Sequence, residues 1–165
     1  MGFVQKEWLI YFYESADEPK DDWLYFIKDG FRHCGALGYV PLTGKWNHLE
    51  WTHKGIRHTT LDDEEVTQIL TYLAEFQVLR CPVKEQWQLL RIKDYTCVSF
   101  IMRLIGYYKW WIFTPYQLYC ALKKAGYKDY YDKIRRKNAK AEKEQNTRRN
   151  NSRTQRTTRS RRSTS

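Results

Sequence analysis

The 165-residue chain lacks the features that mark a disulfide-bonded, secreted or membrane-spanning protein. It has no C-x-x-C pair, no apolar run of 18 or more residues, and no apolar leader ahead of its first strand-like run. Its cysteines are few and widely spaced, at Cys34, Cys81, Cys97 and Cys120. These absences predict free thiols in a reducing cytoplasm, with no signal peptide and no membrane span.

Most of the chain also lacks excess charge, although the formal net charge is +10. Residues 133–165 contain 13 Lys and Arg against 2 Glu, a net charge of +11, which leaves residues 1–132 at −1. We therefore expect one domain over 1–132 and a separate basic tail over 133–165. The near-neutral domain argues against a basic groove in which its many Trp and Tyr side chains would stack on nucleic acid.

The tail has almost no large apolar residue after Ile134, so burial cannot offset the entropy lost on ordering. We predict that it is disordered apart from a helical extension at its start. It would bind phosphate polyanions such as nucleic acid by counterion release, and a merely solubilising tail is the alternative. A membrane surface is less favoured, because the tail has no apolar anchors. The basic residues that we assign to polyanion binding are Arg135, Arg136, Lys137, Arg148, Arg149, Arg161 and Arg162.

Apolar periodicity predicts an α+β domain in which a small antiparallel sheet packs against helices. Strand-like runs occupy 8–15, 31–40, 45–52, 55–61, 78–83 and 87–94, and residues 23–30 form a strand or a short helix. The second and third runs form a hairpin about Thr43-Gly44. Helices are expected over 61–76, from Cys97 to about Tyr108, and over 113–126, where Thr114, Pro115 and Gly126 mark the two ends.

The stretch "YTCVSFIMRLIG", residues 95–106, places Cys97 at a helix start with Thr96 as the cap. A thiol in the first turn of a helix lies beside unpaired N–H groups, which lower its pKa from about 8.5 towards neutrality. The same N–H groups, including that of Cys97, could stabilise an oxyanion. Cys97 is thus either a nucleophile or one more buried cysteine at a helix end.

Among the four histidines, His33 is the best candidate for a base, because an apolar strand is a rigid platform for an imidazole. A turn centred on Thr43-Gly44 places Lys54 opposite His33. The even positions of the partner strand then share the face of His33, so Glu50 or His48 would orient the imidazole. A register slip of one residue would reverse these faces.

The order His33, then Glu50 or His48, then Cys97 resembles the circularly permuted papain-like superfamily, in which the histidine precedes the cysteine. The pattern "FRHC…W…LEW…TCVSFIMRLIG…TPYQLYCAL" is similar to small phage-encoded members of its lecithin retinol acyltransferase-like branch. The resemblance covers about residues 8–126. It implies Cys97 as nucleophile, His33 as general base and then acid, and Glu50 or His48 as the orienting residue, with no cofactor.

The resemblance implies a thiol-dependent peptidase, amidase or acyltransferase that acts on a peptide, amide or ester, in the cytoplasm of a bacterial host or within a phage particle. The alternative is a non-catalytic papain-like protein tethered to nucleic acid by its tail. Cys34 is expected to face away from His33, into the core. A zinc site from Cys34, His33, His48 and His53 does not match known zinc-ligand spacings. The aromatic run "YYKWWIF", residues 107–113, either closes the core, which we favour, or lines a substrate groove.

Overall fold

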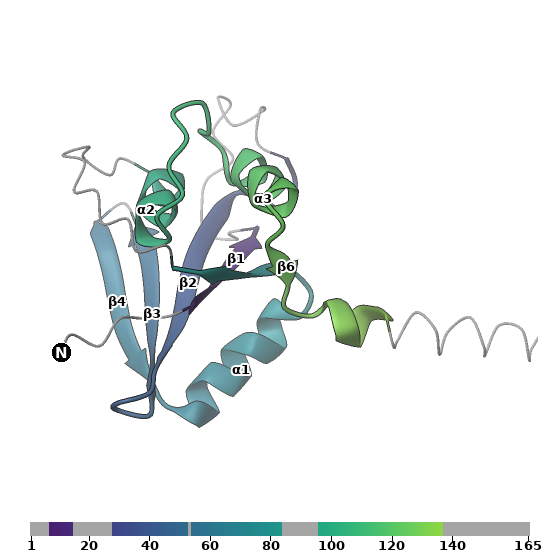
Figure 1. Ribbon diagram of the computed structural model, residues 1–165. Helices are drawn as coiled ribbons and strands as arrows, with labels where there is room; N and C mark the ends of the chain where they lie inside the picture. The colour runs from purple at the N-terminus through teal and green to yellow at the C-terminus, as the bar shows by residue number, and fades with distance from the viewer. Residues whose placement is uncertain (1–6, 15–27, 53, 84–95, 137–165) are drawn as a thin grey trace, which may run out of the picture. The chain divides into compact units, whose positions relative to one another are not determined.

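The computed structural model describes residues 7–14, 28–52, 54–83 and 96–136. The chain divides into two compact units, Met1–Tyr130 and Tyr131–Ser165. The first unit is an α+β domain built on a six-stranded antiparallel sheet in the order β4-β3-β2-β1-β5-β6 (Figure 1). The coarse fold class predicted from the sequence is therefore confirmed.

The strands coincide with the apolar and β-branched runs of the sequence. Their bounds are β1 Glu7–Tyr13, β2 His33–Val40, β3 Lys45–Thr52, β4 Gly55–Leu61, β5 Gln77–Pro82 and β6 Lys128–Asp129. The two-residue β6 has no strand-like run of its own and was not predicted. The expected strand at 87–94, most of the run at 23–30 and the tail from Lys137 onward lie outside the described residues.

The β2–β3 hairpin fixes which side chains share a face. Val40 pairs with Lys45 and Gly35 pairs with Glu50. The register is therefore shifted by two residues from the predicted one, which placed Lys54 opposite His33. The turn spans four residues rather than two, with Gly44 at φ 65°. Because the difference is an even number of residues, the predicted faces survive.

Helices α1, α2 and α3 begin at capping boxes that the sequence contains. The helix α1 (Asp63–Leu73) follows Asp62, α2 (Cys97–Leu104) follows Thr96, and α3 (Pro115–Lys124) follows Thr114. Both α2 and α3 are followed two residues later by a glycine with positive φ, at 66° for Gly106 and 88° for Gly126. The helix from Cys97 thus ends four residues before the predicted Tyr108.

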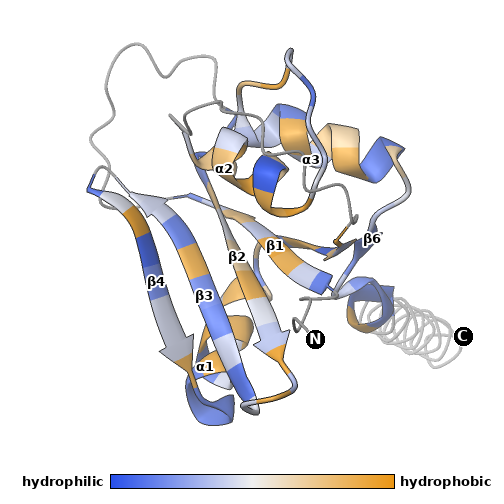
Figure 2. Cartoon of the chain, turned by 60° about the vertical axis from the view of Figure 1, so that its left-hand side comes forward, coloured by the Kyte–Doolittle hydropathy of each residue, from blue (hydrophilic) through white to orange (hydrophobic). Residues whose placement is uncertain are grey.

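The main core lies between one face of the sheet and the helices α2 and α3. Alternate residues of the central strands, including Ile10, Cys34 and Leu79, pack there against Ile101 and Leu118. Figures 1 and 2 show α2 and α3 together on one side, with α1 apart from them. The other strand face carries buried Leu9 and Leu37 beside a set of polar groups that is described below.

The second unit is described over its first residues alone. They form a helical turn at 132–136, in which the Arg136 and Asp132 side chains pair at 2.9 Å. Arg135 belongs to the same turn, with its N–H bonded to the carbonyl of Tyr131. The predicted helical extension therefore exists at the start of the tail.

Candidate active site

His33 is the first residue of β2 and pairs with Tyr13, the last residue of β1. The residue is buried, with 8% of its surface exposed. The Tyr13 ring meets the imidazole edge-on, with 5.4 Å between ring centroids. The strand and the tyrosine together fix where the imidazole lies, as expected for a base that must be aimed at a partner.

Cys97 is the first residue of α2, and its thiol contacts both Cys34 and His33 of β2. Hydrogen bonds from the Cys34 side chain and the His33 imidazole, with the charge of that imidazole, hold the pKa of the Cys97 thiol well below its ordinary value, although burial opposes this. The Thr96 hydroxyl accepts a hydrogen bond from the Ser99 N–H at 3.1 Å. The Ser99 hydroxyl in turn accepts one from the Thr96 N–H at 3.2 Å. This cap sets Cys97 in the first turn, where the helix dipole favours the thiolate.

Cys34 has a role that its place in the strand did not reveal. It is fully buried in the core, as expected, yet its side chain is hydrogen-bonded to that of Cys97. Burial and the neighbouring Cys97 raise the pKa of the Cys34 thiol, so Cys34 keeps its proton and donates a hydrogen bond to the Cys97 sulfur. The strand alternation that separates Cys34 from His33 does not prevent both from reaching the start of α2.

We expect Cys34→Ala to raise the pKa of Cys97, because the thiolate then loses a hydrogen-bond donor. The alkylation midpoint of Cys97 should therefore move to higher pH. It is measured from the pH dependence of Cys97 alkylation by iodoacetamide. Cys34→Ser is the matched control, since serine restores a donor of similar size. Equal midpoints for the alanine variant and the wild type would contradict this role.

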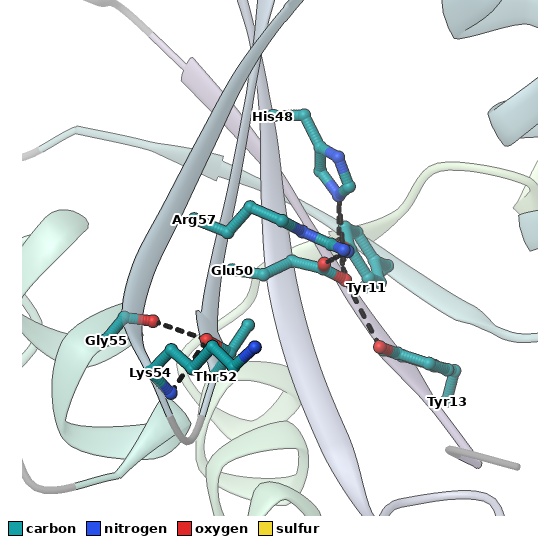
Figure 3. A network of polar contacts seen from close by, with 8 residues as sticks. All are labelled: Tyr11, Tyr13, His48, Glu50, Thr52, Lys54, Gly55 and Arg57. Atoms are coloured by element: carbon teal, nitrogen blue, oxygen red, sulfur yellow. Dashed lines mark hydrogen bonds and ion pairs between the residues drawn. The ribbon is translucent and has the colours of Figure 1, made fainter. Parts of the chain in front are cut away.

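Glu50 is buried on β3, and Figure 3 shows how four neighbouring side chains converge on it. The Tyr11 hydroxyl donates to its Oε1 at 2.7 Å and the Tyr13 hydroxyl at 3.2 Å. The Arg57 guanidinium pairs with Oε2, and His48 Nε2 lies 3.7 Å from Oε1. A carboxylate with this many donors is stable without water.

The Tyr11 hydroxyl has a single hydrogen, and this decides which group donates in each hydrogen bond of the network. Since that hydrogen is donated to Glu50, the 2.5 Å contact between Tyr11 Oη and His48 Nε2 requires the proton to sit on His48. Burial would raise the pKa of the Glu50 carboxyl, but the nearby His48 side chain and the hydrogen bonds from Tyr11 and Arg57 overcome this and hold that pKa far below its usual range. Burial and the Glu50 charge raise the pKa of Tyr11 well above its ordinary value.

Gly35 makes room for this arrangement. It lies on β2 between Tyr11 of β1 and Glu50 of β3, paired with both. A Cβ at position 35 would overlap the Tyr11 phenol. Glycine is needed here for the close approach of the ring, which crosses β2 to reach Glu50 on the next strand.

The structure places the predicted orienting residues, Glu50 and His48, on the same sheet face as His33. Tyr13 connects the two parts, because its ring packs on His33 and its hydroxyl bonds to Glu50. Tyr11, Tyr13 and Arg57 were not proposed from the sequence. The alternation of Tyr11 and Tyr13 along one strand was the available signal, but a tyrosine in a strand is ordinarily read as core.

Other candidate groups lie elsewhere. His58 is exposed on β4 and contacts Asn47 Oδ1 at 3.0 Å, and His53 is outside the described residues. Within residues 7–14, 28–52, 54–83 and 96–136, no three His, Cys, Asp or Glu side chains are grouped so that they could hold a metal ion. None of the helices in these ranges is long and apolar enough to cross a membrane.

No protein-family model, curated protein or solved structure matches this chain significantly.

Proposed function

We propose that the protein is a thiol-dependent hydrolase or acyltransferase of permuted papain-like type, acting on an amide, peptide or ester. The observation that carries the proposal is the Cys97 thiol at a capped helix start, hydrogen-bonded to a buried histidine on the adjoining strand. The chain order His33, Glu50, Cys97 supports the permuted type. Nucleophilic catalysis by cysteine needs a thiol within reach of a base, and the contact between Cys97 and His33 supports that assignment.

The reaction would proceed through an acyl-enzyme. The Cys97 thiolate attacks the carbonyl carbon, a C–S bond forms, and the electron pair moves to the carbonyl oxygen, where the Cys97 N–H contributes to the oxyanion hole. Collapse of this intermediate breaks the bond to the leaving group, which takes a proton from the His33 imidazolium. His33 then removes a proton from water, or from another acceptor, as that molecule attacks the thioester, and the C–S bond breaks to release the acyl product and restore the Cys97 thiolate beside the His33 imidazolium.

The Tyr13–Glu50 contact would serve His33 as the orienting carboxylate does in a triad, with the tyrosine ring interposed. The ring restricts the imidazole, and the Glu50 carboxylate restricts the ring through its hydroxyl. Arg57 and His48 keep the carboxylate ionised while it is buried. Glu50 and Tyr13 are therefore positioning residues in this proposal.

The test is alkylation of the wild-type protein by iodoacetamide across pH 5.5 to 9, with each cysteine quantified by mass spectrometry. A free thiol ionises near 8.5, so a thiolate stabilised by its surroundings reacts at about pH 6, where an ordinary cysteine is nearly inert. We expect Cys97 to react at least about tenfold faster than Cys120 at that pH. Cys120 is the internal reference because it is exposed on α3, whereas Cys34 and Cys81 are buried.

Equal rates for Cys97 and Cys120 at pH 6 would count against the proposal. A rapid alkylation of Cys97 whose rate is unchanged in His33→Ala would also count against it, because the histidine would then not stabilise the thiolate.

A further inference from the structure

The connection between α2 and α3 exposes an aromatic cluster that the proposed chemistry does not use. We define the aromatic loop as residues 107–113. Trp110 is 71% exposed, Phe113 69%, and Trp111 and Tyr108 are about half exposed. The sequence-based preference for a core role is thus wrong for these four residues, and holds for Ile112, which is 4% exposed.

The loop is held in place while its aromatic side chains face outward. Ile112 is anchored in the core between the helices, and its N–H bonds to the Lys109 carbonyl at 3.2 Å. The Gln117 side chain accepts the N–H groups of Phe113 and Thr114 at 2.9 and 3.1 Å. A fixed backbone lowers the entropy lost when the exposed rings bind something.

The shape and composition of the loop identify the kind of surface that it fits. In Figures 1 and 2 the connection rises beyond α2 and α3, and four of its aromatic side chains are exposed there. It combines Trp, Tyr and Phe with a lysine, Lys109, whose ammonium lies 5.4 Å from the centre of the Trp111 ring. Amphipathic rings beside a lysine are the composition that settles at the headgroup level of a bilayer.

The charge of the chain supplies a second, independent attraction to an anionic surface. Residues 133–165 carry a net charge of +11. A basic segment alone is attracted to anionic lipids but has no apolar group to insert, and a small aromatic tip alone inserts weakly. Stable peripheral binding takes two such signals, and this chain contains both.

We propose that the aromatic loop inserts into the headgroup region of a bilayer that contains anionic lipid, with the basic tail adding electrostatic attraction. The protein then binds a membrane peripherally. This inference does not depend on the chemistry proposed for Cys97, because no residue of the aromatic loop belongs to that site.

The test is flotation of the full chain with vesicles of phosphatidylcholine containing about a quarter phosphatidylglycerol. Trp110→Ala combined with Phe113→Ala should weaken partitioning roughly tenfold or more, because two large exposed rings are lost. The matched control is Leu42→Ala combined with Tyr72→Ala, which removes two other exposed apolar side chains at positions outside the loop. The control should bind as the wild type does.

Salt separates the two contributions. Near 1 M NaCl the Debye length is about 3 Å, so attraction by the tail is screened and the difference between the loop variant and the wild type persists. No flotation of the wild type, or equal flotation of the loop variant and the wild type, would overturn the proposal. So would loss of binding to a single-stranded oligonucleotide in the loop variant with vesicle binding intact, which would assign the rings to base stacking.

Discussion

His33→Ala is expected to slow the hydrolysis of an activated ester, such as p-nitrophenyl acetate, by about 10²- to 10⁴-fold. The imidazole serves twice in the proposed cycle, first stabilising the Cys97 thiolate and then activating water against the thioester. Removing it leaves the Cys34 hydrogen bond but takes away the hydrogen bond and the charge by which His33 also lowers the pKa of Cys97. Acylation and deacylation should therefore both become slower.

The measurement is a pre-steady-state burst followed by steady turnover, with Cys97→Ala as the variant in which the burst disappears. His58→Ala is the matched control, because it removes an exposed imidazole of the same sheet that contacts Asn47. Turnover in His33→Ala equal to that of His58→Ala would exclude His33 as the base. A remaining burst in Cys97→Ala would assign the nucleophile elsewhere.

The parts of the fold that local patterns determine could be predicted from the sequence. The starts of α2 and α3 follow from Thr96 and Thr114, since each cap forms hydrogen bonds within three residues of itself. The hairpin follows from two apolar runs and a turn between them. The register was predicted two residues off, because turn length depends on how four residues at 41–44 bond, which the pattern of apolar residues does not encode.

The candidate site was predictable as a set of separated residues and not as a network. Cys97 and His33 are signalled by a helix cap and by an apolar strand. Tyr11, by contrast, reaches Glu50 only because β1, β2 and β3 are neighbours and because residue 35 has no side chain. Strand order and the contact of Tyr11 with a residue two strands away belong to the tertiary structure. The alternation of residues along one strand predicts which face each side chain occupies, but it does not predict these contacts.

In the aromatic loop, the sequence likewise does not predict which side chains are exposed. Seven residues that are nearly all apolar or aromatic are ordinarily core, and burial of Ile112 follows that rule. Its neighbours lie in a turn that leaves the helix layer, where nothing in the described part of the first unit covers them. A run without a clear period cannot reveal which of its members point outward.

Glu50→Gln is expected to lower the free energy of unfolding by about 2 kcal/mol at pH 7. The amide cannot accept from Tyr11, Tyr13 and Arg57 as the carboxylate does, and it leaves buried donors poorly paired. The effect is measured by urea unfolding monitored by tryptophan fluorescence. Glu7→Gln is the matched control, because its ion pair with Arg80 at 2.9 Å is exposed and worth less than about 1 kcal/mol.

The pH dependence separates this role from a general loss of packing. The folded state holds the pKa of Glu50 well below its unfolded value of about 4.3, so the unfolded state binds the extra proton first on acidification. The stabilisation is complete above pH 4.3 and declines as the pH falls further, by up to about 1.4 kcal/mol per pH unit. Glu50→Gln has no such proton to bind, so its stability should fall less steeply than that of the wild type between pH 4.3 and 3. If the free energy of unfolding falls equally steeply with decreasing pH in the two proteins, Glu50 is not held ionised by Tyr11, His48 and Arg57.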